Sequence, residues 1–279
     1  MPTDTRLLQV DGLSVSFRHG AHAVRDITFN IGQERVGVVG ESGSGKTMTG
    51  RAIMRLEPKG ARLTARRLAF LGQDLLAMPE RKLSRLRGGS LALIMQDPRY
   101  SLNPVRPVGR QIAEAAALHL GLGRSAATRA ATDALAAVRI RDPGHVATLY
   151  PHQVSGGMGQ RIMIAMMLLA RPRLVIADEP TSALDVSVRK DIMRLLDELV
   201  RDNRSGLMLI SHDIRLVAHF CDRILVMLQG RIVEEFTTLA EARHPYTRAL
   251  IEGLPSLDGP RRRRLAEPDR AALAAMAAP

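Results

Sequence analysis

The sequence predicts an α/β fold with a core of buried strands and helices, an antiparallel β edge and an inserted α-helical subdomain. Three observations predict it. The first 31 residues alternate short apolar segments with polar turns, which is typical of antiparallel strands. A continuous apolar run over residues 35–39 indicates a buried strand. A glycine-rich turn and a helical stretch at about 46–56 follow it. Residues 97–153 are rich in alanine with helical spacing, which indicates inserted helices.

The remaining elements follow in chain order. The antiparallel edge should contain strands at residues 7–10, 13–17 and 27–31. After the inserted helices, the core should resume with helices at about 158–169 and 188–202, strands at 174–177 and 207–210, and a hairpin at 224–235. Beyond residue 257 the chain is rich in proline, arginine and alanine, which predicts a loosely ordered tail. We therefore expect one domain at 1–257, with a helical subdomain at about 97–160, and a tail at 258–279.

The composition limits the kinds of function. There are 40 basic and 28 acidic residues, so the net charge is +12 and the surface should be basic; contact with anionic lipid headgroups is an alternative interpretation. Aromatic residues make up 3% and tryptophan is absent, so we expect no direct nucleic-acid binding. The single cysteine, Cys221, excludes an internal disulfide and any metal site built from several thiolates of this chain.

We predict no membrane-spanning helix. The longest apolar run near the middle of the chain is residues 162–170, far shorter than the roughly 20 residues that a spanning helix needs. The first six residues lack the apolar core of a signal peptide. We therefore expect a cytoplasmic protein that reaches a membrane only through its partners.

The most specific motif lies at residues 40–47, which read Gly-Glu-Ser-Gly-Ser-Gly-Lys-Thr and match the phosphate-binding pattern G-x-x-x-x-G-K-[ST] in full. Glycines let backbone N–H groups point at phosphate oxygens, and the following helix adds its dipole. We expect Lys46 to hold the β- and γ-phosphates of ATP and the Thr47 hydroxyl to bind Mg²⁺. The predicted nucleotide-binding residues of this loop are Gly40, Ser42, Gly43, Ser44, Gly45, Lys46 and Thr47.

A pair of carboxylates follows the apolar strand at 174–177. In proteins with this phosphate loop, an Asp at the end of such a strand meets the Mg²⁺ shell, which makes Asp178 the predicted metal ligand. Glu179, one residue further on, can polarise the attacking water as a general base. Two adjacent carboxylates are costly to bury without cations, and Mg²⁺ with Lys46 would supply them.

A second candidate anion site lies at residues 154–161, which read Val-Ser-Gly-Gly-Met-Gly-Gln-Arg. Ser155 and the amides of Gly156 and Gly157 should cap a helix N-terminus, and a chain cannot easily fold this site onto its own phosphate loop. The string resembles the signature motif of the ABC transporter ATPases, usually Leu-Ser-Gly-Gly-x-x-Gln-Arg. In that family, the motif binds the γ-phosphate that the opposite subunit holds.

This string departs from the family pattern at two positions. Val154 replaces the usual leucine, which is a mild change. Gly159 stands where related importers usually carry arginine. We expect this glycine to cost about 1 kcal/mol of helix propensity and to remove a cation from the surface.

Further elements resemble the ABC family in their order and spacing. Gln96 resembles the Q-loop glutamine that senses Mg²⁺ and the attacking water, and His212 resembles the switch histidine on the γ-phosphate. Asp185 ends residues 182–185, which resemble the D-loop that crosses the dimer interface. Phe17 is the best candidate for the aromatic that stacks on adenine.

Three further strings narrow the resemblance to the oligopeptide, dipeptide and nickel importer ATPases: residues 96–104, 150–153 and 244–250. Members of this family often end in a cysteine-rich segment that binds an iron–sulfur cluster. This chain has no such cysteines, so we do not expect the cluster. Its shorter tail resembles the nickel or metallophore branch.

The resemblance implies a P-loop ABC ATPase fold and an ATP-binding, ATP-hydrolysing importer subunit with ATP and Mg²⁺ as cofactors. The substrate stays open between short peptides, nickel and metal–chelator complexes. The implied partners are a second ABC ATPase subunit, more often a different chain, two transmembrane permease subunits and an extracytoplasmic solute-binding protein. The chain would then lie peripherally on the cytoplasmic face of the cell membrane.

Two alternatives belong to other classes. The first is a soluble ABC ATPase that acts on nucleic acid or the ribosome, although such proteins usually carry two cassettes, a long coiled-coil insertion or zinc-hook cysteines. The second is a regulatory or structural module that binds ATP without hydrolysing it, and the presence of Glu179 and His212 disfavours it.

Overall fold

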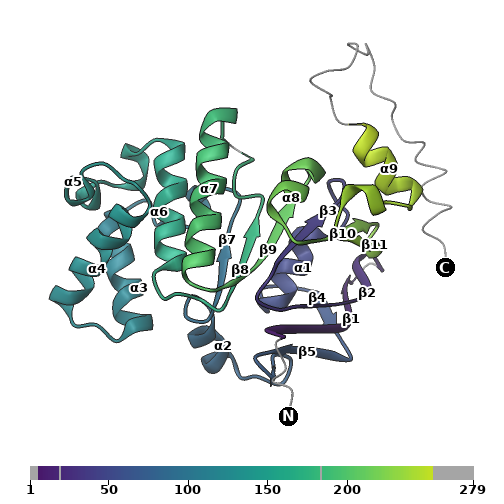
Figure 1. Cartoon of the computed structure of the whole chain (residues 1–279). Coiled ribbons are helices and arrows are strands. Elements are labelled where there is room, and N and C mark those ends of the chain that lie inside the picture. The colour runs from purple at the N-terminus through teal and green to yellow at the C-terminus, as the bar shows by residue number, and fades with distance from the viewer. Residues whose placement is uncertain (1–5, 19, 183, 254–279) are drawn as a thin grey trace.

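The computed structural model describes residues 6–18, 20–182 and 184–253. The tail predicted at 258–279 lies outside these residues, and the predicted domain limits stay predictions. None of the described helices combines the length and the apolar character needed to cross a bilayer. The chain forms two sheets with helices packed around them, which confirms the predicted α/β class (Figure 1).

The central sheet has six strands in the order β11-β10-β3-β9-β8-β7. Five of them pair in parallel, and β11 closes the β10–β11 hairpin at one edge. The strands are β3 (Arg35–Val39), β7 (Leu91–Ile94), β8 (Leu174–Asp178), β9 (Gly206–Ser211), β10 (Arg223–Leu228) and β11 (Arg231–Phe236). The strands expected at 35–39, 174–177 and 207–210, and the hairpin, are therefore confirmed.

Both faces of the central sheet are covered. On β9, Leu207 and Leu209 belong to the core cluster beneath α6 and α7, whereas Met208 and Ile210 belong to the cluster shared with α1 and the second sheet. This alternation follows the two-residue period of a strand. It also explains why these strands read as unbroken apolar runs, since strands buried on both faces carry no polar alternation.

The second sheet has five antiparallel strands and packs at the lower right in Figure 1. Its strands are β1 (Leu8–Phe17), β2 (His22–Ile31), β4 (Ala61–Thr64), β5 (Arg67–Phe70) and β6 (Gln73–Asp74). Residues 7–10 and 13–17 were expected as two strands, and this expectation is wrong. Gly12 takes a left-handed φ of 63° at a shift in the β1–β2 register, so the chain bulges there and continues as one strand.

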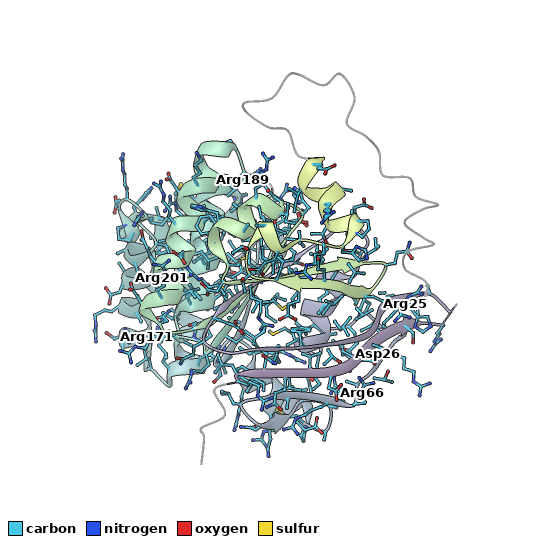
Figure 2. All side chains as sticks on the ribbon, turned by 45° about the vertical axis from the view of Figure 1, so that its right-hand side comes forward. Arg25, Asp26, Arg66, Arg171, Arg189 and Arg201 are labelled. Atoms are coloured by element: carbon cyan, nitrogen blue, oxygen red, sulfur yellow. The ribbon has the colours of Figure 1, made fainter. Side chains whose placement is uncertain are left out.

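Three charged residues mark the outer side of this sheet. Figure 2 labels Arg25, Asp26 and Arg66 there, and Arg66 forms ion pairs of 2.8 Å with both Asp26 and Asp11. Because Arg66 and Asp26 are each 60% exposed, water screens these pairs and they add little stability.

The helical subdomain lies at the far left in Figure 1. It contains α3 (Val108–Leu120), α4 (Arg124–Ala137) and α5 (Pro143–Thr148), which confirms the inserted helices. Two helices lie between it and the central sheet, α6 (Gly156–Leu168) and α7 (Val186–Asp202). The remaining helices are α1 (Lys46–Ile53), α2 (Glu80–Leu86), α8 (Ile214–Phe220) and α9 (Pro245–Glu252), with 3-10 turns η1 (Pro98–Tyr100), η2 (Pro151–Gln153) and η3 (Leu239–Glu241).

Candidate functional site

The predicted site residues gather at the carboxyl ends of the parallel strands. Gly40 follows β3, Asp178 is the last residue of β8, and His212 follows β9. The register aligns these ends, because Val39 pairs with Ser211 and Asp178 pairs with Ile210. In open parallel sheets, ligands bind at this edge.

The phosphate loop encloses the side chain of Lys46. Its ammonium donates hydrogen bonds of 2.8 Å to the carbonyl oxygens of Gly40 and Glu41. Burial lowers the pKa of Lys46, while the carboxylates of Glu179, Asp178 and Glu41 oppose that shift. The loop therefore holds a buried cation at its centre, which suits it to bind an anion.

Glycine is required at two positions of this loop. A Cβ on Gly40 would lie 2.2 Å from the carbonyl oxygen of Met227, and one on Gly45 would lie 2.4 Å from that of Ala23. Both residues also have positive φ, 155° for Gly40 and 103° for Gly45. The loop is thus packed between β2 and β10.

The hydroxyl of Ser44 indicates which ligand the loop accepts. Its oxygen is buried and finds no hydrogen-bond partner among the described residues. The backbone oxygen of Ser44 is already engaged, since Gly230 donates to it at 3.0 Å from the β10–β11 turn. A buried hydroxyl without a partner is costly, and a phosphate oxygen in the loop would satisfy it.

A cavity of about 310 Å³ lies beside the loop and is lined by both polar and apolar side chains. Thr47 donates a 3.0 Å hydrogen bond to Oδ1 of Asp178 at its wall, and Gln96 also lines it. Burial and the nearby Glu179 raise the pKa of Asp178, whereas the Thr47 hydrogen bond, Arg51 and Lys46 lower it. Hydroxyl, carboxylate and amide oxygens in one cavity are the donors that Mg²⁺ prefers.

Glu179 is held in an uncommon backbone conformation. Its φ is 46°, in the left-handed region, and its N–H donates to the carbonyl of Ile210 at 2.9 Å. Its Oε2 lies 3.2 Å from Nδ1 of His212, so the two candidate catalytic side chains face each other. Non-glycine residues with positive φ are often found at functional sites because the surrounding structure must hold them there.

The predicted second anion site is the N-terminus of α6. Ser155 caps this helix by accepting a 3.3 Å hydrogen bond from the N–H of Met158. Ser155 and Gly156 are exposed. The first turn of α6 thus offers backbone N–H groups to an outside ligand.

The residues predicted as the D-loop lie directly beside this turn. Asp185 caps α7 by accepting a 3.0 Å hydrogen bond from the N–H of Val188. A Cβ on Gly157 would lie 3.0 Å from Val188, and one on Gly156 would lie 4.0 Å from Leu184. The two helix N-termini therefore meet at one surface, which brings Ser155, Gly156, Gly157 and Asp185 together.

Comparison with known proteins agrees with this geometry. The family profile described as "ABC transporter" matches residues 24–182. The chain is 46% identical over 256 residues to the dipeptide transport ATP-binding protein DppD of Escherichia coli (strain K12), covering 89% of this chain and 78% of the relative. It is 42% identical over 259 residues to the oligopeptide transport ATP-binding protein OppD of Salmonella typhimurium (strain LT2), covering 90% and 77%.

The chain belongs to the ABC transporter family. It is an ATP-binding, ATP-hydrolysing subunit of that family, which confirms the resemblance found in the sequence.

Solved structures show the same fold. The structure of cbiO1 from Clostridium perfringens matches with a TM-score of 0.71 and 25% identity, covering 84% of this chain and 89% of cbiO1. The post-hydrolysis dimer of the ATP-binding cassette MJ0796, bound to ADP and Pi, matches with a TM-score of 0.73 and 23% identity, covering 82% of this chain and 98% of the cassette. The predicted ABC ATPase fold is therefore confirmed.

Gly159 of this ABC ATPase corrects one expectation. The position was expected at the surface, but Gly159 is buried against η1, and a Cβ there would lie 3.3 Å from Cγ of Pro98. The glycine lets α6 approach the segment that follows Gln96. Glycine at this position lowers the helix propensity of α6, and it also allows α6 to pack closely against η1.

Phe17 ends β1 and is half-buried opposite Ala61 of β4. Its N–H donates to the carbonyl of Ala21 at 2.8 Å, which closes the turn to β2. Its role as the aromatic that stacks on adenine stays a prediction.

Sequence reasoning missed one residue at the phosphate loop. Tyr246 is fully buried on α9, and its hydroxyl accepts a 2.8 Å hydrogen bond from the N–H of Glu41. The two residues are 205 positions apart, so no local pattern could connect them. The only signal was the string at 244–250, which resembled the importer family without indicating a role.

Proposed function

We propose that this ABC ATPase energises the uptake of short peptides through membrane permease partners. One observation carries the proposal: relatives 46% and 42% identical over about nine-tenths of this chain are named for dipeptide and oligopeptide transport. None of the named relatives favours the alternative, an ABC ATPase that acts on nucleic acid or the ribosome.

The nucleotide would bind with its phosphates in the loop at 40–47. Lys46 would exchange its contacts with the loop carbonyls for phosphate oxygens, and the Ser44 hydroxyl would gain its missing partner. Thr47, Asp178 and Gln96 supply oxygen donors that fit Mg²⁺. When bound, this ion would neutralise charge that develops on the phosphates.

Hydrolysis would depend on Glu179 and His212. The carboxylate of Glu179 would orient the attacking water and accept its proton as general base. His212, 3.2 Å away, would hold the Glu179 carboxylate on one side and reach the γ-phosphate on the other. The backbone of Glu179 is already fixed at positive φ, so little reorganisation is needed.

Two ATPase subunits would share each nucleotide. The buried phosphate loop of one subunit would face the exposed N-terminus of α6 of the other, where Ser155, Gly156 and Gly157 would bind the γ-phosphate. Loss of that phosphate would remove the bridging charge and open the pair. The partners would be a second, different ATPase chain, two permease subunits and an extracytoplasmic solute-binding protein, with this chain peripheral on the cytoplasmic face of the membrane.

Transport assays in cells deleted for this chain test the proposal. The deletion strain, complemented with wild type or with Glu179→Gln, would be tested for uptake of radiolabelled di- and oligopeptides and of radioactive nickel. We expect peptide uptake to return only with wild type. Loss of nickel uptake with normal peptide uptake would refute the substrate but leave the ATPase assignment intact. Normal uptake of both would refute the peptide substrate and leave metal–chelator complexes as the remaining candidate.

A further inference from the structure

We infer that Tyr246 is a positioning residue that holds the first peptide unit of the phosphate loop in its binding conformation. The inference rests on the loop's binding of nucleotide phosphates. It concerns a residue outside the matched family region, 24–182.

One peptide unit of the loop is fixed from two sides. Its carbonyl belongs to Gly40 and accepts from the ammonium of Lys46 at 2.8 Å, and its N–H belongs to Glu41 and donates to the Tyr246 hydroxyl at 2.8 Å. A peptide unit is planar, so these two bonds together fix its rotation. That rotation sets the direction of the backbone groups that follow.

The two hydrogen bonds, from Lys46 to the Gly40 carbonyl and from the Glu41 N–H to Tyr246, should respond differently when a phosphate binds. The Lys46 ammonium is the group that would turn toward the phosphate, so its bond to Gly40 is weakened or shared. The Tyr246 hydroxyl lies on the other side of the loop from that event and keeps its bond. Tyr246 would therefore preserve the shape of the loop while Lys46 changes partner.

Tyr246 can do this because α9 is itself rigidly attached. His244 caps the helix, its Nδ1 accepting from the N–H of Tyr246 at 3.2 Å. Oε1 of Glu234 on β11 accepts from the N–H groups of Arg243 at 2.5 Å and of His244 at 2.9 Å. The start of α9 is thus tied to the same hairpin whose turn contacts Ser44.

Burial reinforces the arrangement. The ring of Tyr246 is fully buried in the main core cluster, and this packing fixes the position of its hydroxyl. Burial raises the pKa of Tyr246 to about 12. The hydrogen bond from the Glu41 N–H lowers this pKa, and the charge of the Glu41 carboxylate raises it. The hydroxyl therefore stays neutral throughout the physiological range.

Tyr246→Phe tests the inference, because it removes the hydroxyl and keeps the ring. We expect the full chain carrying this change to bind the fluorescent nucleotide mant-ADP with Mg²⁺ about 5- to 10-fold more weakly, the effect of one lost hydrogen bond. Hydrogen–deuterium exchange should rise in the peptide that covers residues 40–47 and stay unchanged in β8 and β9.

Thr247→Val is the matched control. Thr247 is the next residue of α9 and is equally buried, and this change also removes one buried hydroxyl with little change in volume. That hydroxyl faces the carboxylate of Glu234, whose pKa it lowers, and among the described residues no hydrogen bond joins it to the loop. We expect wild-type affinity for mant-ADP. A Lys46→Ala variant that binds mant-ADP normally would instead refute phosphate binding by the loop itself.

Three results would overturn the role of Tyr246 while leaving the loop assignment in place. The first is affinity within twofold of wild type in Tyr246→Phe. The second is an equal loss in Thr247→Val. The third is loss of the fold in Tyr246→Phe at the assay temperature, because the hydroxyl would then serve the core and not the loop.

Discussion

The phosphate loop and the N-terminus of α6 are both predicted to bind anions and are both built from glycine and serine, yet one is enclosed by the fold and the other is exposed. The loop is enclosed: a buried Lys46 fills it, and Met227, Ala23 and Tyr246 pack or bond against it. The turn at Ser155 and Gly156 is exposed, and the Ser155 side chain bonds to the N–H of Met158 in the helix that follows. Under the proposed function, one chain would therefore offer a preorganised half-site for its own nucleotide and a second half-site for the nucleotide of another subunit.

The largest expected effect comes from Glu179→Gln at the enclosed half-site. Removing the general base should lower the turnover of ATP by about 10²- to 10⁴-fold, because the glutamine amide cannot accept the proton of water. Binding of ATP should persist, since the proposed role of Glu179 is to act on the attacking water and not to hold the phosphates. Steady-state phosphate release and equilibrium binding measure the two quantities. Wild-type turnover would show that the base lies elsewhere.

Asp178→Asn should separate catalysis from stability at the same half-site. Loss of the carboxylate should lower Mg²⁺-dependent ATPase activity by about 10²-fold. The same change should raise the melting temperature in Mg²⁺-free buffer by about 2–4 °C, because it removes a charge whose burial raises the pKa of Asp178. Differential scanning calorimetry checks the second effect. A fall in melting temperature would mean that the carboxylate stabilises the fold.

Gly156→Asp examines the exposed half-site. An aspartate in the first turn favours the helix but repels a phosphate brought by the other subunit. We expect ATPase activity of the assembled transporter to fall about 10- to 100-fold, while the isolated chain binds ATP normally. The control is Gly123→Asp, which adds the same charge at the exposed N-cap of α4. Weaker ATP binding by the isolated Gly156→Asp chain would contradict the separation of the two half-sites.

Phe17→Ala gives the smallest expected effect. Loss of stacking on adenine should raise the KM for ATP about 5- to 10-fold and leave kcat unchanged, because the ring would act on binding and not on the reacting phosphates. A titration of ATPase rate against ATP concentration measures both constants. An unchanged KM would exclude Phe17 as the adenine platform.

Much of the enclosed half-site could be predicted because its chemistry is local in the chain. Residues 40–47 combine the required glycines, lysine and threonine in one string, and the apolar runs before Lys46 and Asp178 marked the strands that carry them. The contact between Glu179 and His212 could be anticipated only through the family order, since the strand β9 lies between them in the chain. The bulge at Gly12 was missed because a polar pair within a strand has the same pattern as a turn.

The sequence alone determined the class of fold, the phosphate loop, the carboxylate pair and the signature turn, because periodicity and short motifs are properties of neighbouring residues. The tertiary structure alone decided that Gly159 is buried against Pro98 and that the Tyr246 hydroxyl accepts a hydrogen bond from the N–H of Glu41. These contacts join segments that are 61 and 205 positions apart, and only the packing of helices on the central sheet brings such segments together.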